Sequence, residues 1–180
     1  MTVLEAPLKG LYIIENKVFR DERGYFYESF NKETLKRNNL EFDFVQDNIS
    51  MSCKNTLRGL HFQNPPHAQG KLVSVLKGSV LDVAVDIRTN SPTYGKHFSL
   101  VLSSSNNKSL WIPAGFAHGF LALEDQTCFF YKCTNYYNKD AESSLCWNDP
   151  DLNIDWGIKN PIVSDKDLKA GEFKSFSSLF

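Results

Sequence analysis

The chain has 180 residues, 42% of them hydrophobic and 23% charged, and this ordinary composition excludes disordered and fibrous proteins. Its formal net charge of −1 excludes the basic surface of a general nucleic-acid binder, and no apolar run approaches the roughly 18 residues of a membrane helix. We therefore expect one folded domain over residues 1–180, with no nucleic-acid partner and no membrane partner.

The cysteines point to the cellular compartment. The four of them form no CxxC pair, and residues 1–10 lack the basic region and apolar core of a secretory signal. A reducing cytoplasm keeps such thiols free. We therefore expect a cytoplasmic protein without disulfides.

The predicted elements are mostly strands. Asn31 is a favourable N-cap and predicts a short helix over residues 32–37. Turn residues then separate short apolar strands, and Lys77-Gly78 fits a tight hairpin. The expected strands cover residues 57–63, 71–76, 79–87, 109–112, 116–123 and 129–134. Ser164 predicts a second short helix, and we expect residues 171–180 to pack loosely or against a partner. This pattern predicts an all-β jelly roll, an antiparallel sandwich or barrel, with a few short helices at its ends.

Alternation along residues 80–87 predicts two different strand faces. Leu81, Val83 and Val85 share one face, and Asp82 and Asp86 share the other. We expect the first face to be core and the second to be polar.

His61 and Lys71 are the first candidates for chemistry. His61 shares a strand face with the small Gly59 and with Gln63, although a structural histidine would fit the same pattern. Lys71 shares parity with Val73, so it is either an inward cation that meets an anion or a solvated strand end. A base and a cation at the same end of the predicted jelly roll would suit a reaction that forms a carbanion.

Two arginines suit a diphosphate. Arg23 lies beside the turn residue Gly24, and paired guanidinium groups clamp phosphates bidentately, whereas each alone is more often a surface ion pair. Strict alternation puts Arg58 on the face opposite His61. Either a bulge at Gly59 turns Arg58 inward, or Arg58 serves another surface.

The remaining candidates for chemistry are Tyr131, Asp167 and His118. Tyr131 could donate a proton, and Asp167 could orient a histidine, although packing and helix capping explain them equally well. His118 is inward by parity, which raises the question of a metal. Jelly-roll metal sites usually need two histidines one residue apart and a carboxylate, but Gln63 stands at the partner position of His61. We therefore expect no metal site.

Ordered motifs along the chain resemble the dTDP-4-dehydrorhamnose 3,5-epimerase family. The resemblance covers about residues 9–167, and its motifs lie at residues 19–26, 46–48, 57–63, 69–73, 82–88, 91–93, 115–120, 131–132 and 164–167. It implies a cupin-like jelly roll that works as a homodimer on a dTDP-sugar, without metal or cofactor.

The resemblance also implies roles for individual residues. His61 matches the base, Tyr131 the acid, Asp167 the partner of the histidine, and Lys71 the cation beside the sugar ketone. The positions that match contacts to nucleotide or sugar, some of them reaching across the dimer, are Arg23, Phe26, Glu28, Gln46, Asn48, Arg58, Gln63, His118, Tyr137, Glu142 and Lys166.

The implied reaction inverts carbons 3 and 5 of dTDP-4-dehydro-6-deoxy-D-glucose, giving dTDP-4-dehydro-L-rhamnose for dTDP-L-rhamnose synthesis. The ketone acidifies both C–H bonds, so a histidine can remove a proton if an ammonium group stabilises the enolate. Three alternatives stay open: epimerisation at a single carbon, a non-catalytic sugar-nucleotide-binding cupin, and a metal-dependent cupin oxygenase.

Overall fold

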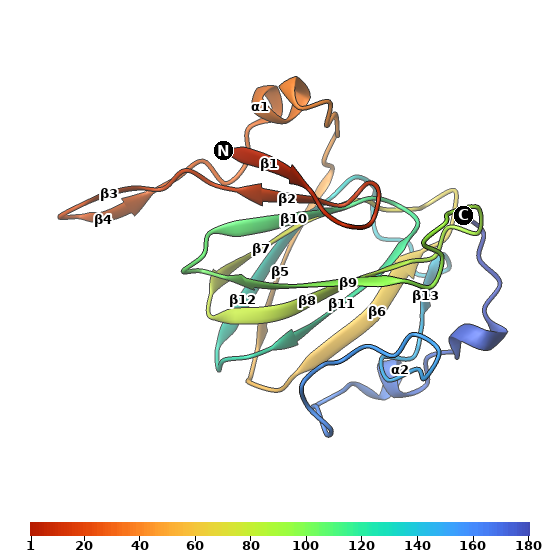
Figure 1. Cartoon of the computed structure of the whole chain (residues 1–180). Coiled ribbons are helices and arrows are strands. Elements are labelled where there is room, and N and C mark those ends of the chain that lie inside the picture. Colours follow the sequence, from red (N-terminus) through yellow and green to blue (C-terminus); the bar gives the residue numbers. More distant parts are fainter.

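Two antiparallel sheets face each other in the computed structural model, which describes all residues 1–180 (Figure 1). The six-stranded sheet has the order β1 (Thr2–Glu5), β2 (Tyr12–Glu15), β10 (Lys108–Ile112), β7 (Lys71–Lys77), β12 (Thr127–Cys133) and β5 (Gln46–Ser52). The five-stranded sheet has the order β13 (Glu142–Ser144), β6 (Leu57–Gln63), β11 (Phe116–Ala122), β8 (Ser79–Asp86) and β9 (His97–Ser103). The remaining elements are the hairpin β3 (Phe19–Asp21) and β4 (Gly24–Phe26), the helices α1 (Lys32–Arg37) and α2 (Asp165–Leu168), and the 3-10 helix η1 (Phe173–Ser175).

The main core fills the space between the sheets. Val73 and Phe129 come from the six-stranded sheet, Ala84 and Phe120 come from the five-stranded sheet, and each is at most 5% exposed. Side chains of alternate parity on facing strands interdigitate in this way in a jelly roll. The predicted all-β jelly roll is therefore confirmed.

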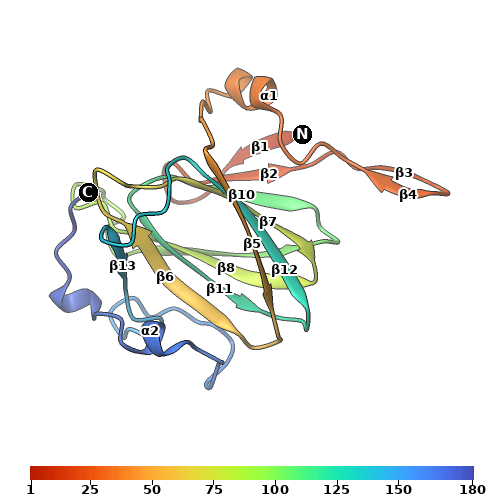
Figure 2. The ribbon, with the colours of Figure 1, turned by 180° about the vertical axis from the view of Figure 1, so that it is seen from behind.

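The outer face of each sheet is covered as well. Leu35 of α1 packs with Leu72 and Trp111 on the outside of the six-stranded sheet. On the outside of the five-stranded sheet, Phe173, Phe176 and Phe180 pack against a cluster that includes Leu60 and Val85, and Figure 2 shows the C-terminal segment running beside β6 and β13. Residues 171–180, expected to pack loosely or against a partner, thus lie on this chain's own sheet, although none of them is fully buried.

This double covering corrects the prediction for β8. Asp82 and Asp86 are both completely buried, although alternation predicted a polar, solvated face for them. They point to the same side as Val80 and Ala84, which is the interior between the sheets. The opposite face, with Val83 and Val85, is covered by the C-terminal segment. Both faces of β8 are core, and the two carboxylates need partners inside it.

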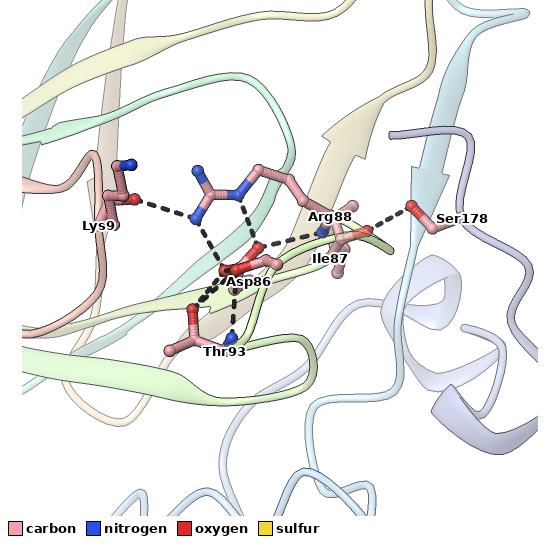
Figure 3. A network of polar contacts seen from close by, with 7 residues as sticks. Lys9, Asp86, Ile87, Arg88, Thr93 and Ser178 are labelled. Atoms are coloured by element: carbon pink, nitrogen blue, oxygen red, sulfur yellow. Dashed lines mark hydrogen bonds and ion pairs between the residues drawn. The ribbon is translucent and has the colours of Figure 1, made fainter.

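Asp86 finds those partners at the end of β8 (Figure 3). Its carboxylate accepts hydrogen bonds from Arg88 Nε at 2.8 Å, Ser91 Oγ at 2.6 Å and Thr93 Oγ1 at 2.6 Å. Burial alone would raise the pKa of Asp86, but these hydrogen bonds overcome it and lower the pKa to about 2. Arg88 also donates to the carbonyl of Lys9. The network fastens the N-terminal loop and the turn after β8 to the sandwich.

The short helices lie where the sequence predicted them. The Asn31 side chain accepts the backbone N–H of Thr34 at the start of α1, and the Ser164 side chain accepts that of Asp167 at the start of α2. The predicted strands are confirmed within two residues at each end, whereas β1, β2, β5, β9 and β13 and the β3–β4 hairpin were not predicted as strands. All four cysteines are free, and no helix has the length and apolar character to span a membrane.

The β3–β4 hairpin stands away from the sandwich in both views (Figures 1 and 2). Its aromatic residues Phe19, Tyr25 and Phe26 are 54%, 54% and 67% exposed. Exposed aromatic groups on a projecting arm are typical of a surface that meets another molecule.

Candidate active site

Two adjoining cavities open at the side of the sandwich where β6, β7, β11 and β12 come together. One has a volume of about 450 Å³ and is lined by Arg58, His118, Lys166 and Asp167, among others. The other, of about 290 Å³, is lined by Gln46, Asn48, Gln63, Tyr137 and Glu142, among others. His61, Lys71 and Tyr131 line both cavities. These three side chains, singled out from the sequence, therefore lie at the junction.

His61 is held by a buried carboxylate. Its Nε2 lies 2.6 Å from Oδ1 of Asp167, which is only 3% exposed, and the other carboxylate oxygen accepts the Gly59 N–H at 3.3 Å. Burial would raise the pKa of Asp167, but the hydrogen bonds from His61, Gly59 and Ser164 lower it, so the group is ionised at neutral pH. An ionised carboxylate only accepts hydrogen bonds, so Nε2 carries the proton and Nδ1 is left with a free lone pair.

A bulge in β6 sets the direction of Arg58. In the pairing of β6 with β11, His61 lies opposite His118 and Arg58 lies opposite Phe120, so Gly59 and Leu60 together face the single residue Gly119. This extra residue reverses the alternation and puts Arg58 on the cavity side together with His61. Of the two alternatives left open for Arg58, the structure therefore shows the bulge at Gly59.

The bulge requires glycine on both strands. Gly59 has a φ of +128°, and a Cβ built there would lie 2.5 Å from the Cα of Gly119. A Cβ on Gly119 would in turn lie 2.8 Å from the carbonyl oxygen of Arg58. The two glycines let the strands approach closely enough to keep His61 and Arg58 in register with the cavity.

Lys71 and Tyr131 come from the six-stranded sheet. The Lys71 side chain makes no hydrogen bond and no ion pair within the chain, although its backbone pairs with β10 and β12. Burial lowers the pKa of Lys71, while Cys133, Asp82 and Glu142 oppose this shift. Burial raises the pKa of Tyr131, with a smaller opposing effect from Arg58, so this phenol stays protonated at neutral pH. The junction thus holds a cation without an anionic partner and a proton donor.

The smaller cavity is edged by a chain of polar contacts. Glu142 accepts a hydrogen bond from Tyr137 Oη at 2.9 Å and pairs with Lys166 Nζ at 2.5 Å. Burial would raise the pKa of Glu142, but Lys166 and Tyr137 lower it. Gln46 donates to Asn48 and accepts the backbone N–H of Tyr137. The five predicted contact residues on this side therefore lie together.

Gln63 also lies here, but its amide is already engaged. Its Nε2 donates to the carbonyls of His67 and Tyr136, and its Oε1 accepts the backbone N–H of Asn138. These bonds tie the loop after β6 to the loop after β12. Nowhere in residues 1–180 do three His, Cys, Asp or Glu side chains gather as metal ligands would.

Three predicted contact residues do not reach these two cavities. Arg23 and Phe26 belong to the projecting hairpin, where the Arg23 side chain is 84% exposed and pairs only with Asp21. Glu28 accepts a hydrogen bond from Asn31 next to α1. These residues can serve a site only in a neighbouring molecule.

The sequence reasoning missed Asp82, whose Oδ2 lies 2.9 Å from Nε2 of the cavity residue His118. Alternation placed Asp82 on a solvated face, although its shared parity with the small residue Ala84 could have suggested a buried one. It also missed the unpartnered hydroxyl of Ser50 and the stacked rings of Phe120 and Phe129, which line the larger cavity.

Comparisons with known proteins agree on one family. A family model described as dTDP-4-dehydrorhamnose 3,5-epimerase matches residues 5–175. Proteins of that name from Shigella flexneri and Methanothermobacter thermautotrophicus are 49% and 50% identical to this chain, over 96% and 91% of it and 96% and 90% of their own lengths.

Solved structures of sugar-nucleotide epimerases have the same fold as this chain. That of a dTDP-4-dehydrorhamnose 3,5-epimerase from Elizabethkingia anophelis has a TM-score of 0.91 at 51% identity and covers 97% of both chains. That of a Legionella pneumophila epimerase in complex with dTDP-4-keto-L-rhamnose has a TM-score of 0.93 at 46% identity, covering 98% of this chain and 94% of its own. A 3'-monoepimerase from Streptomyces bikiniensis in complex with dTDP-quinovose has a TM-score of 0.88 at 31% identity, covering 93% and 85%.

Proposed function

This chain belongs to the dTDP-4-dehydrorhamnose 3,5-epimerase family, and we propose that it converts dTDP-4-dehydro-6-deoxy-D-glucose into dTDP-4-dehydro-L-rhamnose at the junction of its two cavities. It is an isomerase of dTDP-L-rhamnose synthesis, and one epimerase domain spans residues 1–180. The four free cysteines fit a cytoplasmic enzyme.

One observation carries the proposal: the base and the acid stand on opposite sheets. His61 projects from β6 of the five-stranded sheet, and Tyr131 projects from β12 of the six-stranded sheet into the same cavities. A sugar ring bound between the sheets therefore meets a base on one face and a proton donor on the other. Inversion of a carbon centre requires this arrangement, because the proton must return to the face opposite the one it left.

His61 begins each inversion. Its Nδ1 takes the proton from carbon 5 or carbon 3, and the buried Asp167 stabilises the imidazolium that forms. The electron pair of the broken C–H bond moves into the ring and leaves the charge on the oxygen of carbon 4. Lys71 donates a hydrogen bond to that oxygen and stabilises the enolate.

Tyr131 completes the inversion by giving its proton to the opposite face of the same carbon. Its pKa is raised by burial, so the phenol is present in the protonated form that this step needs. Exchange with water then restores His61 and Tyr131. Since the substrate's own ketone acidifies both C–H bonds, the chemistry requires no metal and no organic cofactor.

The nucleotide end of the substrate extends toward the polar groups around the junction. Arg58 and Lys166 are cations suited to the diphosphate, and Gln46 and Asn48 offer amides to a base. The exposed ring of Tyr137 stands at the same edge and can stack on thymine.

We also propose a homodimer in which each hairpin completes the site of the other chain. Arg23 and Phe26 lie on an arm that leaves its own sandwich, and Glu28 follows it (Figure 1). A cation and an aromatic ring on such an arm suit the diphosphate and the thymine of a substrate bound by a second copy.

Mixing inactive variants tests this exchange. A mixture of His61→Ala and Arg23→Ala chains, each nearly inactive alone, regains activity if the hairpin acts across the dimer, because each heterodimer then has one site with both residues intact. Activity that stays at the level of the separate variants after subunit exchange, verified by mass spectrometry of the mixed dimers, contradicts the arrangement.

Proton NMR of dTDP-4-dehydro-6-deoxy-D-glucose in deuterated buffer tests the reaction itself. We expect deuterium at carbons 3 and 5 and the L-rhamno configuration in the product. Binding of the substrate without any exchange would indicate a non-catalytic binding protein.

The similarity to a 3'-monoepimerase favours one second candidate, a single-site epimerase with the same fold. It predicts deuterium at one carbon alone in the same NMR experiment.

A further inference from the structure

The cavity wall contains a second histidine–aspartate pair besides His61 and Asp167. His118 on β11 lies directly across from His61 on β6, and both line the larger cavity. His118 Nε2 lies 2.9 Å from Oδ2 of Asp82, and the two residues are 6% and 0% exposed. The Nδ1 of His118 makes no hydrogen bond within the protein, so it is available to a ligand.

Asp82 is unusual because its carboxylate is only half satisfied. Its Oδ1 is buried and has no hydrogen-bond partner in the chain, although a buried carboxylate normally uses both oxygens. Such a group is stable in a protein interior only beside positive charge. The titratable groups that face it are His118 from β11 and Lys71 from β7.

Lys71 in turn faces few other anions. The groups near it are Tyr131 and Cys133 from β12, His61 from β6 and Glu142 from β13. Glu142 is already paired with Lys166 and Tyr137. Asp82 therefore supplies negative charge near Lys71 from inside the sandwich, and its attraction raises the pKa of Lys71 against the effect of burial.

Building on the proposed function, we propose that Asp82 is a positioning residue for the enolate. It accepts the Nε2–H of His118 and so fixes this ring in the cavity wall, and its negative charge lies beside the Lys71 ammonium group that meets the oxygen of carbon 4. Asp82 exchanges no proton with the substrate. The carbon-bound proton still goes to His61, a different proton arrives on the opposite face from Tyr131, and the Lys71 ammonium group stabilises the charge of the enolate.

Kinetics of Asp82→Asn, an isosteric change, test the proposal. We expect kcat to fall on the order of 10²-fold, as for the loss of one oxyanion donor, with a much smaller change in KM. The pKa of Lys71 should fall further once the carboxylate is neutral, so the alkaline limb of the kcat profile should move to lower pH. In a His118→Gln background the same change should reduce kcat less, because the ring that Asp82 positions is already gone.

Asp86→Asn is the matched control for these kinetics, since Asp86 lies on the same strand face and is equally buried. The folded Asp86→Asn enzyme should keep the wild-type kcat and its pH profile.

Nitrogen NMR of the ligand-free protein gives a readout that does not depend on turnover. In the wild type the His118 signals should show the proton on Nε2 hydrogen-bonded to Asp82, and Asp82→Asn should abolish this signature. If the wild type shows the signature but no exchange at carbons 3 and 5, the proposed function fails while the Asp82–His118 pairing stands.

Two results would overturn the role of Asp82. One is a wild-type kcat and pH profile in Asp82→Asn. The other is a loss of kcat in Asp82→Asn that is fully additive with His118→Gln and leaves the alkaline limb in place, because a merely structural carboxylate would behave in that way.

Discussion

Asp82 and Asp86 lie on the same face of β8, four residues apart, and both are completely buried. Asp86 accepts hydrogen bonds from Arg88, Ser91 and Thr93, and its pKa falls to about 2. Asp82 has a single partner, His118, and one oxygen without any. Burial alone therefore does not decide what a carboxylate does. The fully bonded one fixes the fold, and the under-bonded one stands beside the cavity where charge must be stabilised.

The same contrast extends to the regions around them. The cavity holds groups with unfilled hydrogen-bonding capacity, such as Lys71 and the Nδ1 of His61. In the network around Asp86, by contrast, the carboxylate has hydrogen-bond partners for both of its oxygens (Figure 3). We therefore expect cavity variants to lose turnover and keep their stability, and network variants to do the reverse.

Removal of the base should have the largest effect. We expect His61→Ala to reduce the rate of solvent exchange at carbons 3 and 5 by roughly 10³-fold, because a positioned general base contributes about this much. Its Tm should fall less than that of Asp86→Asn, since His61 is only partly buried and Asp167 keeps the hydrogen bond from the Gly59 N–H. NMR measures the rate of solvent exchange, and calorimetry measures the Tm. Full activity in this variant would remove His61 from its assigned role.

Loss of the network should come next. Asp86→Asn leaves Arg88 without its anion and should lower the free energy of unfolding by about 3 kcal/mol, the lower end for a broken buried pair because Arg88 is partly exposed. For a chain of this size the Tm should fall by roughly 6–12 °C. An unchanged Tm would show that the network does not hold the fold, and a strongly reduced kcat in the folded enzyme would erase the contrast between the two carboxylates.

Acid should lower the free energy of unfolding by a smaller amount than the Asp86→Asn substitution does. Because the pKa of Asp86 is lower in the folded state than in the unfolded chain, its stabilisation is fully present above about pH 4 and is lost as the pH falls toward 2. The shift corresponds to about 2 kcal/mol. Urea unfolding of the wild type and Asp86→Asn between pH 5 and 2 measures it. The difference between the two proteins should shrink as the pH falls, and a constant difference would contradict the assigned cause.

Much of this arrangement could be predicted from the sequence, because local rules govern it. Asn31 and Ser164 cap their helices as expected, and the alternation that put His118 inward agrees with the structure. Of the two alternatives left open for Lys71, the structure shows the inward one. The family motifs named many of the residues that line the two cavities, including His61, Lys71 and Tyr131. The parity of Arg58 left a bulge at Gly59 as one of two alternatives, and the structure shows that bulge.

Other features depend on contacts that no local rule describes. Alternation identifies the two faces of β8 but not what covers each face. It therefore predicted a polar face for Asp82 and Asp86, which are in fact part of the buried core. The sequence does not show that the aromatic residues of the C-terminal segment pack on the outer face of the five-stranded sheet, because this contact joins segments far apart in the chain. The hairpin with Arg23 is short and polar at its turn, and only the three-dimensional arrangement shows that it leaves its own chain's site.

The most direct test of the account is the partition between exchange and inversion in Tyr131→Phe, followed by NMR in deuterated buffer. If the base and the acid act from opposite sheets, His61 still removes protons in this variant. Deuterium should then enter carbon 5 or carbon 3 with retention of configuration, while inversion falls on the order of 10²-fold or more. Inversion at the wild-type rate would contradict the account, because the proton would then reach the second face without Tyr131.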